Sequence, residues 1–125
     1  MTDLDSDLGK NLAAKFPWLA EQNFAWGWDC GAGWEDILTK FLAVVDRECP
    51  GGKGFTILQV KEKFGTIRLY FQLDDVDADA AKQIHDAVTL LDARSHFTCE
   101  TCGKRGRQKN AGGYMFVACD EHAAV

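Results

Sequence analysis

The chain has 125 residues, of which 46% are hydrophobic, so it is long enough to bury one hydrophobic core. Its formal net charge of −5 excludes a protein whose whole surface is built to bind phosphate backbones. The charge is uneven, because residues 1–98 contain ten Lys and Arg against sixteen Asp and Glu, and residues 99–125 contain four against three. We therefore expect one compact unit in which the basic charge is concentrated near the C-terminus.

The first ten residues, MTDLDSDLGK, lack the basic start and the apolar run of a signal peptide. No later segment is long and apolar enough to cross a membrane, so we expect a soluble, cytoplasmic protein without membrane contact. The five cysteines are an odd number and exclude a fully paired disulfide framework within one chain. Reducing conditions instead favour free thiols or metal ligands.

Near the N-terminus, apolar residues recur at helical spacing. These residues are Leu8, Leu12, Phe16 and Leu19. Pro17 lacks a backbone donor and crowds the preceding turn, so we expect a short helix to end or kink near Phe16.

The next segment, FAWGWDCGAGW, mixes aromatic residues with glycines and has no period, which predicts an irregular packed loop. Tryptophans at this density can form a stacking platform, but we interpret them as core residues because burial of large rings dominates the stability of small domains. They are Trp18, Trp26, Trp28 and Trp34. Cys30 and Cys49 are interpreted as packed thiols, since no histidine in these segments would activate them.

The clearest helix signal begins at Trp34, where apolar residues form one stripe. The stripe consists of Trp34, Ile37, Leu38, Phe41, Leu42 and Val45. Glu35 and Asp36 lie in the first turn, where the helix dipole favours negative charge, and the sequence CPGG at 49–52 ends the helix.

Two segments, FTILQVKEK and TIRLYFQL, are rich in β-branched and aromatic residues, and the FG between them predicts a tight antiparallel hairpin. The second strand alternates one buried set with one solvated set. The buried set is Ile67, Leu69, Phe71 and Leu73, and the solvated set is Thr66, Arg68, Tyr70 and Gln72.

A second main helix is predicted after the hairpin, because the aspartates of DDVDADAA supply a cap and an acidic first turn. Its apolar side carries Ala81, Ile84, Val88 and Leu91. The sequence therefore predicts an α+β fold with a core at residues 1–98, in which two main helices pack on one face of a hairpin-based sheet. His85 is expected to be a solvated helix residue.

Basic residues on the hairpin permit two interpretations. Lys61, Lys63 and Arg68 can line one strand face together with Tyr70, a mixture that contacts phosphates and bases in nucleic-acid-binding proteins. Lysines also protect exposed strand edges from pairing, and we favour this second interpretation. Glu62 should point to the opposite face.

The C-terminal segment contains two ligand pairs, Cys99 with Cys102 and Cys119 with His122, each with two intervening residues. This spacing is typical of a closed tetrahedral Zn²⁺ site, because each pair grips one side of the ion. The alternatives are a redox-active Cys99–Cys102 pair, and His96 as ligand in place of His122. We favour His122 because it pairs symmetrically with Cys119.

The segment between the two pairs predicts a zinc-ribbon-like module at residues 99–125. Four glycines permit turns there, and YMFVA reads as a short strand that leads into Cys119. The intervening loop carries four basic residues, which either contact an acidic partner or nucleic acid or serve solubility. These residues are Lys104, Arg105, Arg107 and Lys109.

Four motifs, FPWL, WDCGAGWEDIL, VKEKFGTIRLYF and CETCG…CDEHA, resemble those of a family of short, uncharacterised proteins of bacteriophages and prophages. The resemblance spans roughly residues 16–122 and is most specific in the hairpin and the cysteine pairs. It implies metal ligands at Cys99, Cys102, Cys119 and His122. It also implies a setting in the bacterial cytoplasm, where small phage proteins bind host factors or, like anti-CRISPR proteins, inhibit defence complexes.

We expect a zinc-stabilised binding protein that contacts a protein partner through the basic loop and the neighbouring sheet face. The alternative is a nucleic-acid-binding regulator that uses the same loop. Catalysis is not expected, because a closed four-ligand site leaves no position for an activated water, and neither His85 nor His96 lies in a catalytic motif.

Overall fold

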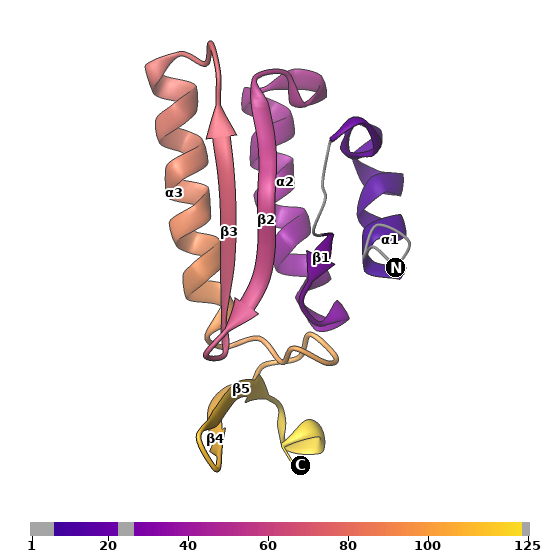
Figure 1. Ribbon diagram of the computed structural model, residues 1–125, viewed down its shortest axis with the longest axis vertical. Helices are drawn as coiled ribbons and strands as arrows, with labels where there is room; N and C mark the ends of the chain where they lie inside the picture. Colours follow the sequence, from indigo (N-terminus) through magenta and orange to yellow (C-terminus); the bar gives the residue numbers. More distant parts are fainter. Residues whose placement is uncertain (1–6, 23–26, 124–125) are drawn as a thin grey trace.

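The computed structural model describes residues 7–22 and 27–123 (Figure 1). The first helix, α1, spans Asp7–Lys15 and is followed by a 3-10 helix at Pro17–Glu21. The predicted end near Phe16 is confirmed, because Pro17 opens the 3-10 helix and cannot continue the hydrogen bonding of α1.

The main sheet has three strands in the order β1-β2-β3. Strand β2 (Phe55–Lys63) and strand β3 (Thr66–Leu73) form the predicted antiparallel hairpin. Strand β1 (Trp28–Asp29) pairs with β2 in parallel. The prediction of an irregular loop is therefore wrong at residues 28–29, since a strand this short has no hydrophobic period from which it could be read.

Two local features set the register of the hairpin. The pairing shifts between Ile57 and Gln59, which leaves Leu58 as the extra residue of a β-bulge. The next residue after Ile57 that faces the core is therefore Val60 rather than Gln59. The turn residues Phe64 and Gly65 both have positive φ angles, of 56° and 77°, as a two-residue type I′ turn requires.

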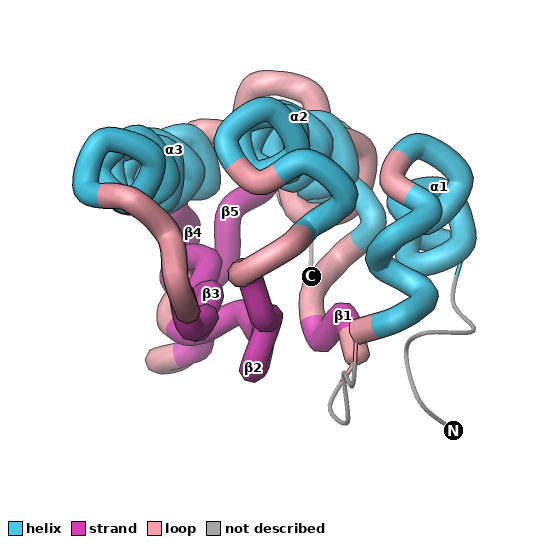
Figure 2. The backbone as a smooth tube through the Cα atoms, turned by 90° about the horizontal axis from the view of Figure 1, so that it is seen from above, coloured by secondary structure: helices cyan, strands magenta, loops and turns pink. Residues whose placement is uncertain are grey.

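Helices α2 (Glu35–Glu48) and α3 (Ala78–Ser95) lie side by side on one face of this sheet (Figure 2). Asp77 caps α3, because its carboxylate accepts a hydrogen bond of 2.8 Å from the backbone N–H of Ala80. The α+β class and the arrangement of two main helices on one face are confirmed. In the part of the chain that the structure describes, no element covers the opposite face of β2 and β3 (Figures 1 and 2).

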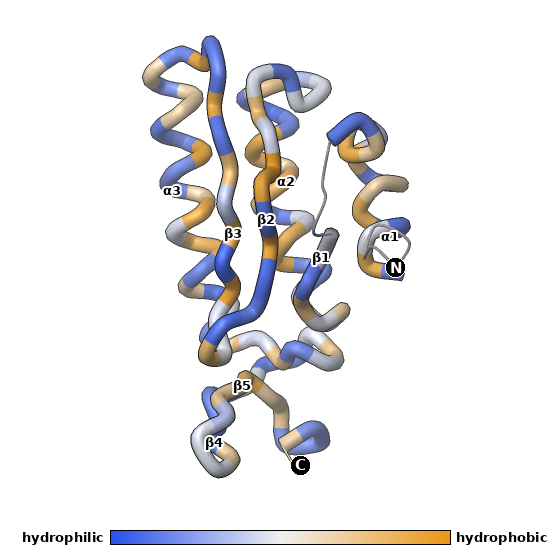
Figure 3. Tube along the Cα trace, in the orientation of Figure 1, coloured by the Kyte–Doolittle hydropathy of each residue, from blue (hydrophilic) through white to orange (hydrophobic). Residues whose placement is uncertain are grey.

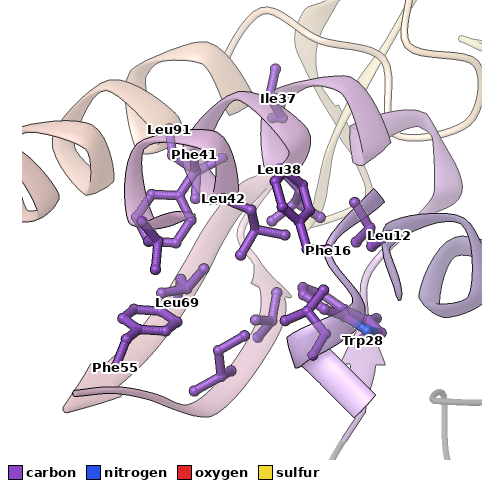
Figure 4. Packing of buried hydrophobic residues seen from close by; sticks show 14 of the residues in the cluster. Leu12, Phe16, Trp28, Ile37, Leu38, Phe41, Leu42, Phe55, Leu69 and Leu91 are labelled. Atoms are coloured by element: carbon purple, nitrogen blue, oxygen red, sulfur yellow. The ribbon is translucent and has the colours of Figure 1, made fainter. Parts of the chain in front are cut away.

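The core lies between these helices and the sheet, and Figure 4 shows side chains from α2 and from the strands pointing toward one another. The predicted stripe of α2 is buried, and the rings of Phe41 and Phe55 meet with centroids 6.1 Å apart. Trp18, Trp28 and Trp34 are buried as expected, whereas Trp26 lies outside the described residues. On α3, Ile84 and Leu91 are buried as predicted.

Two details of the burial prediction are corrected. Ala80, rather than Ala81, is the buried alanine of α3, because it lies four residues before Ile84 on the helix face toward the core. Thr66 is buried at the start of β3, where its hydroxyl donates to the carbonyl of Lys63 across the turn.

The C-terminal segment forms a second, two-stranded sheet. Strands β4 (Arg107–Ala111) and β5 (Tyr114–Ala118) make an antiparallel pair, and a 3-10 helix follows at Asp120–His122. The predicted strand before Cys119 is confirmed. Within the described residues, none of the helices combines the length and apolarity that a membrane span requires.

Candidate metal centre

Four side chains converge at the C-terminal end of the fold: those of Cys99, Cys102, Cys119 and His122. Their ligand atoms all lie within 4.8 Å of one another. The Cys102 and Cys119 sulfurs are 3.6 Å apart, and the His122 Nδ1 lies 3.2 Å from the Cys119 sulfur and 3.7 Å from the Cys99 sulfur. A tetrahedral ion with bonds of about 2.0–2.3 Å needs donors spaced by about 3.5–3.8 Å, so the cluster can hold one metal ion after small adjustments.

The four ligands come from three places in the fold. Cys99 and Cys102 occupy a turn after α3, Cys119 follows the last residue of β5, and His122 ends the short 3-10 helix. Cys99 and Cys119 are buried, whereas Cys102 is exposed. The site therefore has a buried side against the fold and an outer side at Cys102.

Backbone amides stabilise the thiolate forms of two ligands. Burial raises the pKa of Cys99, but N–H groups of Cys119, Cys102 and Thr101 outweigh it and lower the pKa to about 6. Burial likewise raises the pKa of Cys119, and the net effect is a lowered pKa because the His122 ring, Cys102 and nearby amides favour the thiolate. Thiolates are the form in which cysteine binds metal.

The other two ligands retain protons more strongly. An amide hydrogen bond from Lys104 lowers the pKa of Cys102, but desolvation and the thiols of Cys119 and Cys99 together raise it. The pKa of His122 is raised by its contacts with the sulfurs of Cys119 and Cys99. The four donors thus share protons at close range, and a divalent cation displaces protons from such a cluster when it binds.

The two alternatives left open by the sequence are not supported by this geometry. His96 lies outside the cluster, and its Nε2 is 3.7 Å from a carboxylate oxygen of Asp92. Cys99 and Cys102 lie in a turn rather than at the start of a helix after a strand, which is where a thioredoxin-like pair is found. Cys49, Cys99, Cys102 and Cys119 are thiols outside any disulfide in the described chain.

The glycine-rich loop before α2 joins the metal cluster to the core. The backbone N–H of Gly33 donates to the carbonyl of Glu100 at 2.8 Å, and the indole N–H of Trp34 donates to the carbonyl of Thr98 at 2.9 Å. A Cβ added at Gly31 or Gly33 would lie 2.2 Å from a backbone carbonyl oxygen of Glu100 or Cys99. The glycines of the GAG sequence are thus required by close backbone contact with the segment that holds the first two ligands.

Glu100 is a site residue that sequence reasoning missed. Its carboxylate accepts a hydrogen bond of 2.6 Å from the N–H of Val117, and its own N–H donates to the carbonyl of Val117 at 3.0 Å. The pKa of Glu100 is raised by burial, and the nearby charges of Glu62 and Cys99 raise it further. The sequence signal that could have identified Glu100 is an acidic residue between two cysteines. Glu100 joins β5 to the turn that carries Cys99 and Cys102.

The four basic residues of the loop do not form one free patch. Lys104 lies 3.6 Å from Glu121, and Arg107 lies 3.9 Å from Asp120. The guanidinium of Arg105 lies 5.9 Å from the centroid of the Phe97 ring. Lys109 is half-buried on β4. Two of the four positive charges are therefore offset by acidic residues next to the metal ligands.

An open groove lies beside the metal cluster. It consists of two pockets, of about 570 and 670 Å³, that share Phe97 and Arg105. Arg94 lines the first pocket, and Cys119 lines the second. Phe97 is 56% exposed although the Arg105 guanidinium lies over its ring, so the groove presents a large aromatic surface to solvent. Backbone bonds from Gly106 to Phe97 and from Cys99 to Lys104, both of 2.8 Å, hold the two walls together.

The remaining cysteines behave as predicted from their surroundings. Cys49 is buried, and burial raises its pKa, with smaller contributions from the charges of Glu48 and Asp77. Cys30 is half-buried beside the core. Neither residue belongs to the metal cluster.

Comparisons of the chain with protein-family models, curated proteins and solved structures found no match. The resemblance to phage and prophage proteins therefore stays a prediction from the motifs alone. What the chain does has to be inferred from its own geometry.

Proposed function

We propose that the chain is a zinc-stabilised binding protein that recognises a protein partner through the groove at Phe97. The groove carries this proposal, because an exposed aromatic ring lines it together with Arg94 and Arg105, two arginines for which the described residues provide no ion pair. Aromatic and arginine side chains dominate the binding energy of protein interfaces.

The metal's role in this proposal is structural. Three cysteines and one histidine are a donor set that favours Zn²⁺, and four protein ligands complete a tetrahedron without an open position. The loop that contains Lys104 and Arg105 lies between the second and third ligands and forms one wall of the groove. Zinc would hold this wall in place, as in zinc-ribbon modules, because the second hydrophobic cluster is too small to do so alone.

The mixed charge of the groove favours a protein over nucleic acid as its partner. Asp120 and Glu121 line the same pocket as Lys104 and Arg107 and offset their charges. Nucleic-acid binding depends instead on concentrated positive charge. A regulator that binds nucleic acid through this loop is the less supported alternative, and the closed ligand set gives no support to catalysis.

The setting that we propose is the cytoplasm of a bacterial host during phage infection, where the partner is a host or phage protein and the outcome is inhibition of a defence complex. This part of the proposal rests on the motif resemblance and not on the groove.

The test is affinity capture from a bacterial lysate with the zinc-loaded chain, with and without nuclease treatment. We expect a captured protein that persists after nuclease treatment and is lost with the double variant Phe97→Ser, Arg105→Gln. Leu90→Ser is the matched control, because Leu90 is 48% exposed on α3 and does not line the groove. Capture that depends on nucleic acid, or that survives the double variant, would contradict the proposal.

A further inference from the structure

The face of the main sheet that points away from α2 and α3 carries a group of basic and aromatic side chains. The register places Lys61 opposite Arg68, Lys63 opposite Thr66, and Gln59 opposite Tyr70. Tyr70 is 46% exposed, and Phe64, in the turn that joins the strands, is 59% exposed. Figure 3 shows that β2 becomes hydrophilic toward this turn. We call the five residues Lys61, Lys63, Phe64, Arg68 and Tyr70 the basic sheet face.

The pairing of Lys61 with Arg68 is unfavourable for the fold itself. Like charges directly opposite each other on neighbouring strands are destabilising. Protection of a strand edge does not explain Lys61, because β2 is the central strand and Lys61 is paired with Asp29 on one side and with Arg68 on the other. The interpretation that we favoured from the sequence therefore does not apply at this position.

The register places Asp29 of β1 beside Lys61, so one cation of the basic sheet face has an acidic neighbour in the sheet. Within residues 7–22 and 27–123, no salt bridge involves Lys61, Lys63 or Arg68. The Lys61 ammonium lies 5.9 Å from the centroid of the Tyr70 ring, and the Lys63 ammonium lies 5.5 Å from that of Phe64. The cations are thus placed beside exposed rings, on a chain whose net charge is −5.

The turn adds a second conflict between sequence and local structure. Phe64 has a φ of 56°, a left-handed conformation that a bulky side chain rarely adopts and that Asn, Asp or Gly would adopt at lower cost. The strained conformation leaves the ring exposed beside Lys63. Strain of this kind is concentrated at functional sites.

We propose that the basic sheet face binds single-stranded nucleic acid. Lys61, Lys63 and Arg68 would contact phosphates, which would relieve the repulsion between Lys61 and Arg68. Tyr70 and Phe64 would stack on bases, as aromatic residues do in proteins that bind single strands through a sheet or groove. Two cations on alternate residues of β2 lie about 7 Å apart along the strand, so they can follow a backbone rather than grip one phosphate. This site is separate from the groove at Phe97 and does not depend on its function.

The test is fluorescence anisotropy with the zinc-loaded chain and labelled oligothymidylate and oligouridylate of about twelve nucleotides. Three phosphate contacts predict that the logarithm of affinity falls with the logarithm of salt concentration with a slope of about −2, and that each neutralised cation reduces the slope by about 0.7. Lys61→Gln and Arg68→Gln should each weaken binding several-fold while keeping or raising the melting temperature. Tyr70→Leu should weaken binding without changing the salt slope.

Two control variants each remove one positive charge at a position outside the basic sheet face. Lys82 lies on α3 and Lys40 lies on α2, and Lys82→Gln and Lys40→Gln should both leave the affinity unchanged. Absence of binding at about 50 mM salt, equal losses in the control variants, or equal affinity for double-stranded DNA would overturn the proposal. So would tighter binding of polyglutamate than of oligonucleotide, which would assign the face to an acidic protein.

Discussion

The backbone N–H of Gly33 donates to the carbonyl of Glu100 at 2.8 Å, so the loop before α2 is bonded to the segment between the first two cysteines of the metal cluster. The indole of Trp34, a fully buried core residue, makes a parallel contact to the carbonyl of Thr98. The core and the metal cluster are therefore coupled through backbone contacts that only a small residue at position 33 permits.

Gly33→Ala should destabilise the protein by about 1–3 kcal/mol, because the added methyl group would meet rigid backbone atoms of Cys99 and Glu100 that cannot move independently. The measurement is the free energy of unfolding from urea denaturation of the zinc-loaded protein, with tryptophan fluorescence as the signal. Ala32→Ser is the control, since Ala32 is the exposed neighbour in the same loop and should change stability little. Equal stability of Gly33→Ala and the parent protein would contradict the close packing of this loop.

The native protein should contain about one Zn²⁺ per chain by elemental analysis, and Cys102→Ser should lose the metal and lower the melting temperature. Cys102 is the informative ligand because it is exposed, so its replacement removes a donor without disturbing buried packing. Cys30→Ser should keep the metal, because Cys30 lies outside the cluster. A native protein that folds fully and melts at the same temperature without metal would contradict a structural role for zinc.

The parts of the fold that sequence patterns predicted are those with a sustained period. The stripe from Trp34 to Val45 repeats over three helical turns and was buried as expected. The alternation in β3 and the FG turn defined the hairpin. Strand β1 could not be predicted in the same way, because two residues are too few to show a period. Its identity as a strand depends on pairing with residues of β2 that are distant in the sequence. The bulge at Leu58 was equally invisible, since it interrupts an alternation without changing the residue types.

The candidate metal ligands could be predicted because their chemistry is tied to their spacing. Cys99, Cys102, Cys119 and His122 form two compact pairs, and the fold needs only one hairpin to bring the pairs together. The surroundings of the site could not be predicted, because they depend on contacts between distant segments. The acidic partners Asp120 and Glu121, which offset charges of the basic loop, follow Cys119 directly, yet their pairing depends on how β4 lies against β5.

His122→Asn should reduce metal content sharply, whereas His96→Asn should leave it unchanged. The reason is geometric, because the Nδ1 of His122 lies 3.2 Å from the Cys119 sulfur and His96 lies instead beside Asp92 on the last turns of α3. Replacement of Zn²⁺ by Co²⁺ tests the ligands directly, because the visible spectrum of the bound Co²⁺ reports the number of thiolate ligands and the loss of a nitrogen ligand. Metal loss in His96→Asn with an unchanged cobalt spectrum in His122→Asn would exchange the roles of the two histidines.

The stability of the protein should decrease as the pH rises above about 8.5, in part because of Cys49. Burial raises the pKa of this thiol in the folded protein, so it stays protonated there while the same thiol ionises in the unfolded chain. The unfolded state then binds fewer protons than the folded state, and the free energy of unfolding falls with increasing pH. Below the pKa of the unfolded thiol both states are protonated, and this contribution is absent.

The comparison of the parent protein with Cys49→Ala isolates this effect from other groups that titrate at high pH. Both proteins should be measured by urea denaturation between about pH 7 and pH 10, a range that spans the ordinary pKa of cysteine. Cys49→Ala should be less stable at neutral pH, because it leaves a small cavity beside the end of α2, but its stability should fall less steeply with pH. Parallel curves for the two proteins would show that Cys49 ionises equally in the folded and unfolded states, which its burial against the core does not allow.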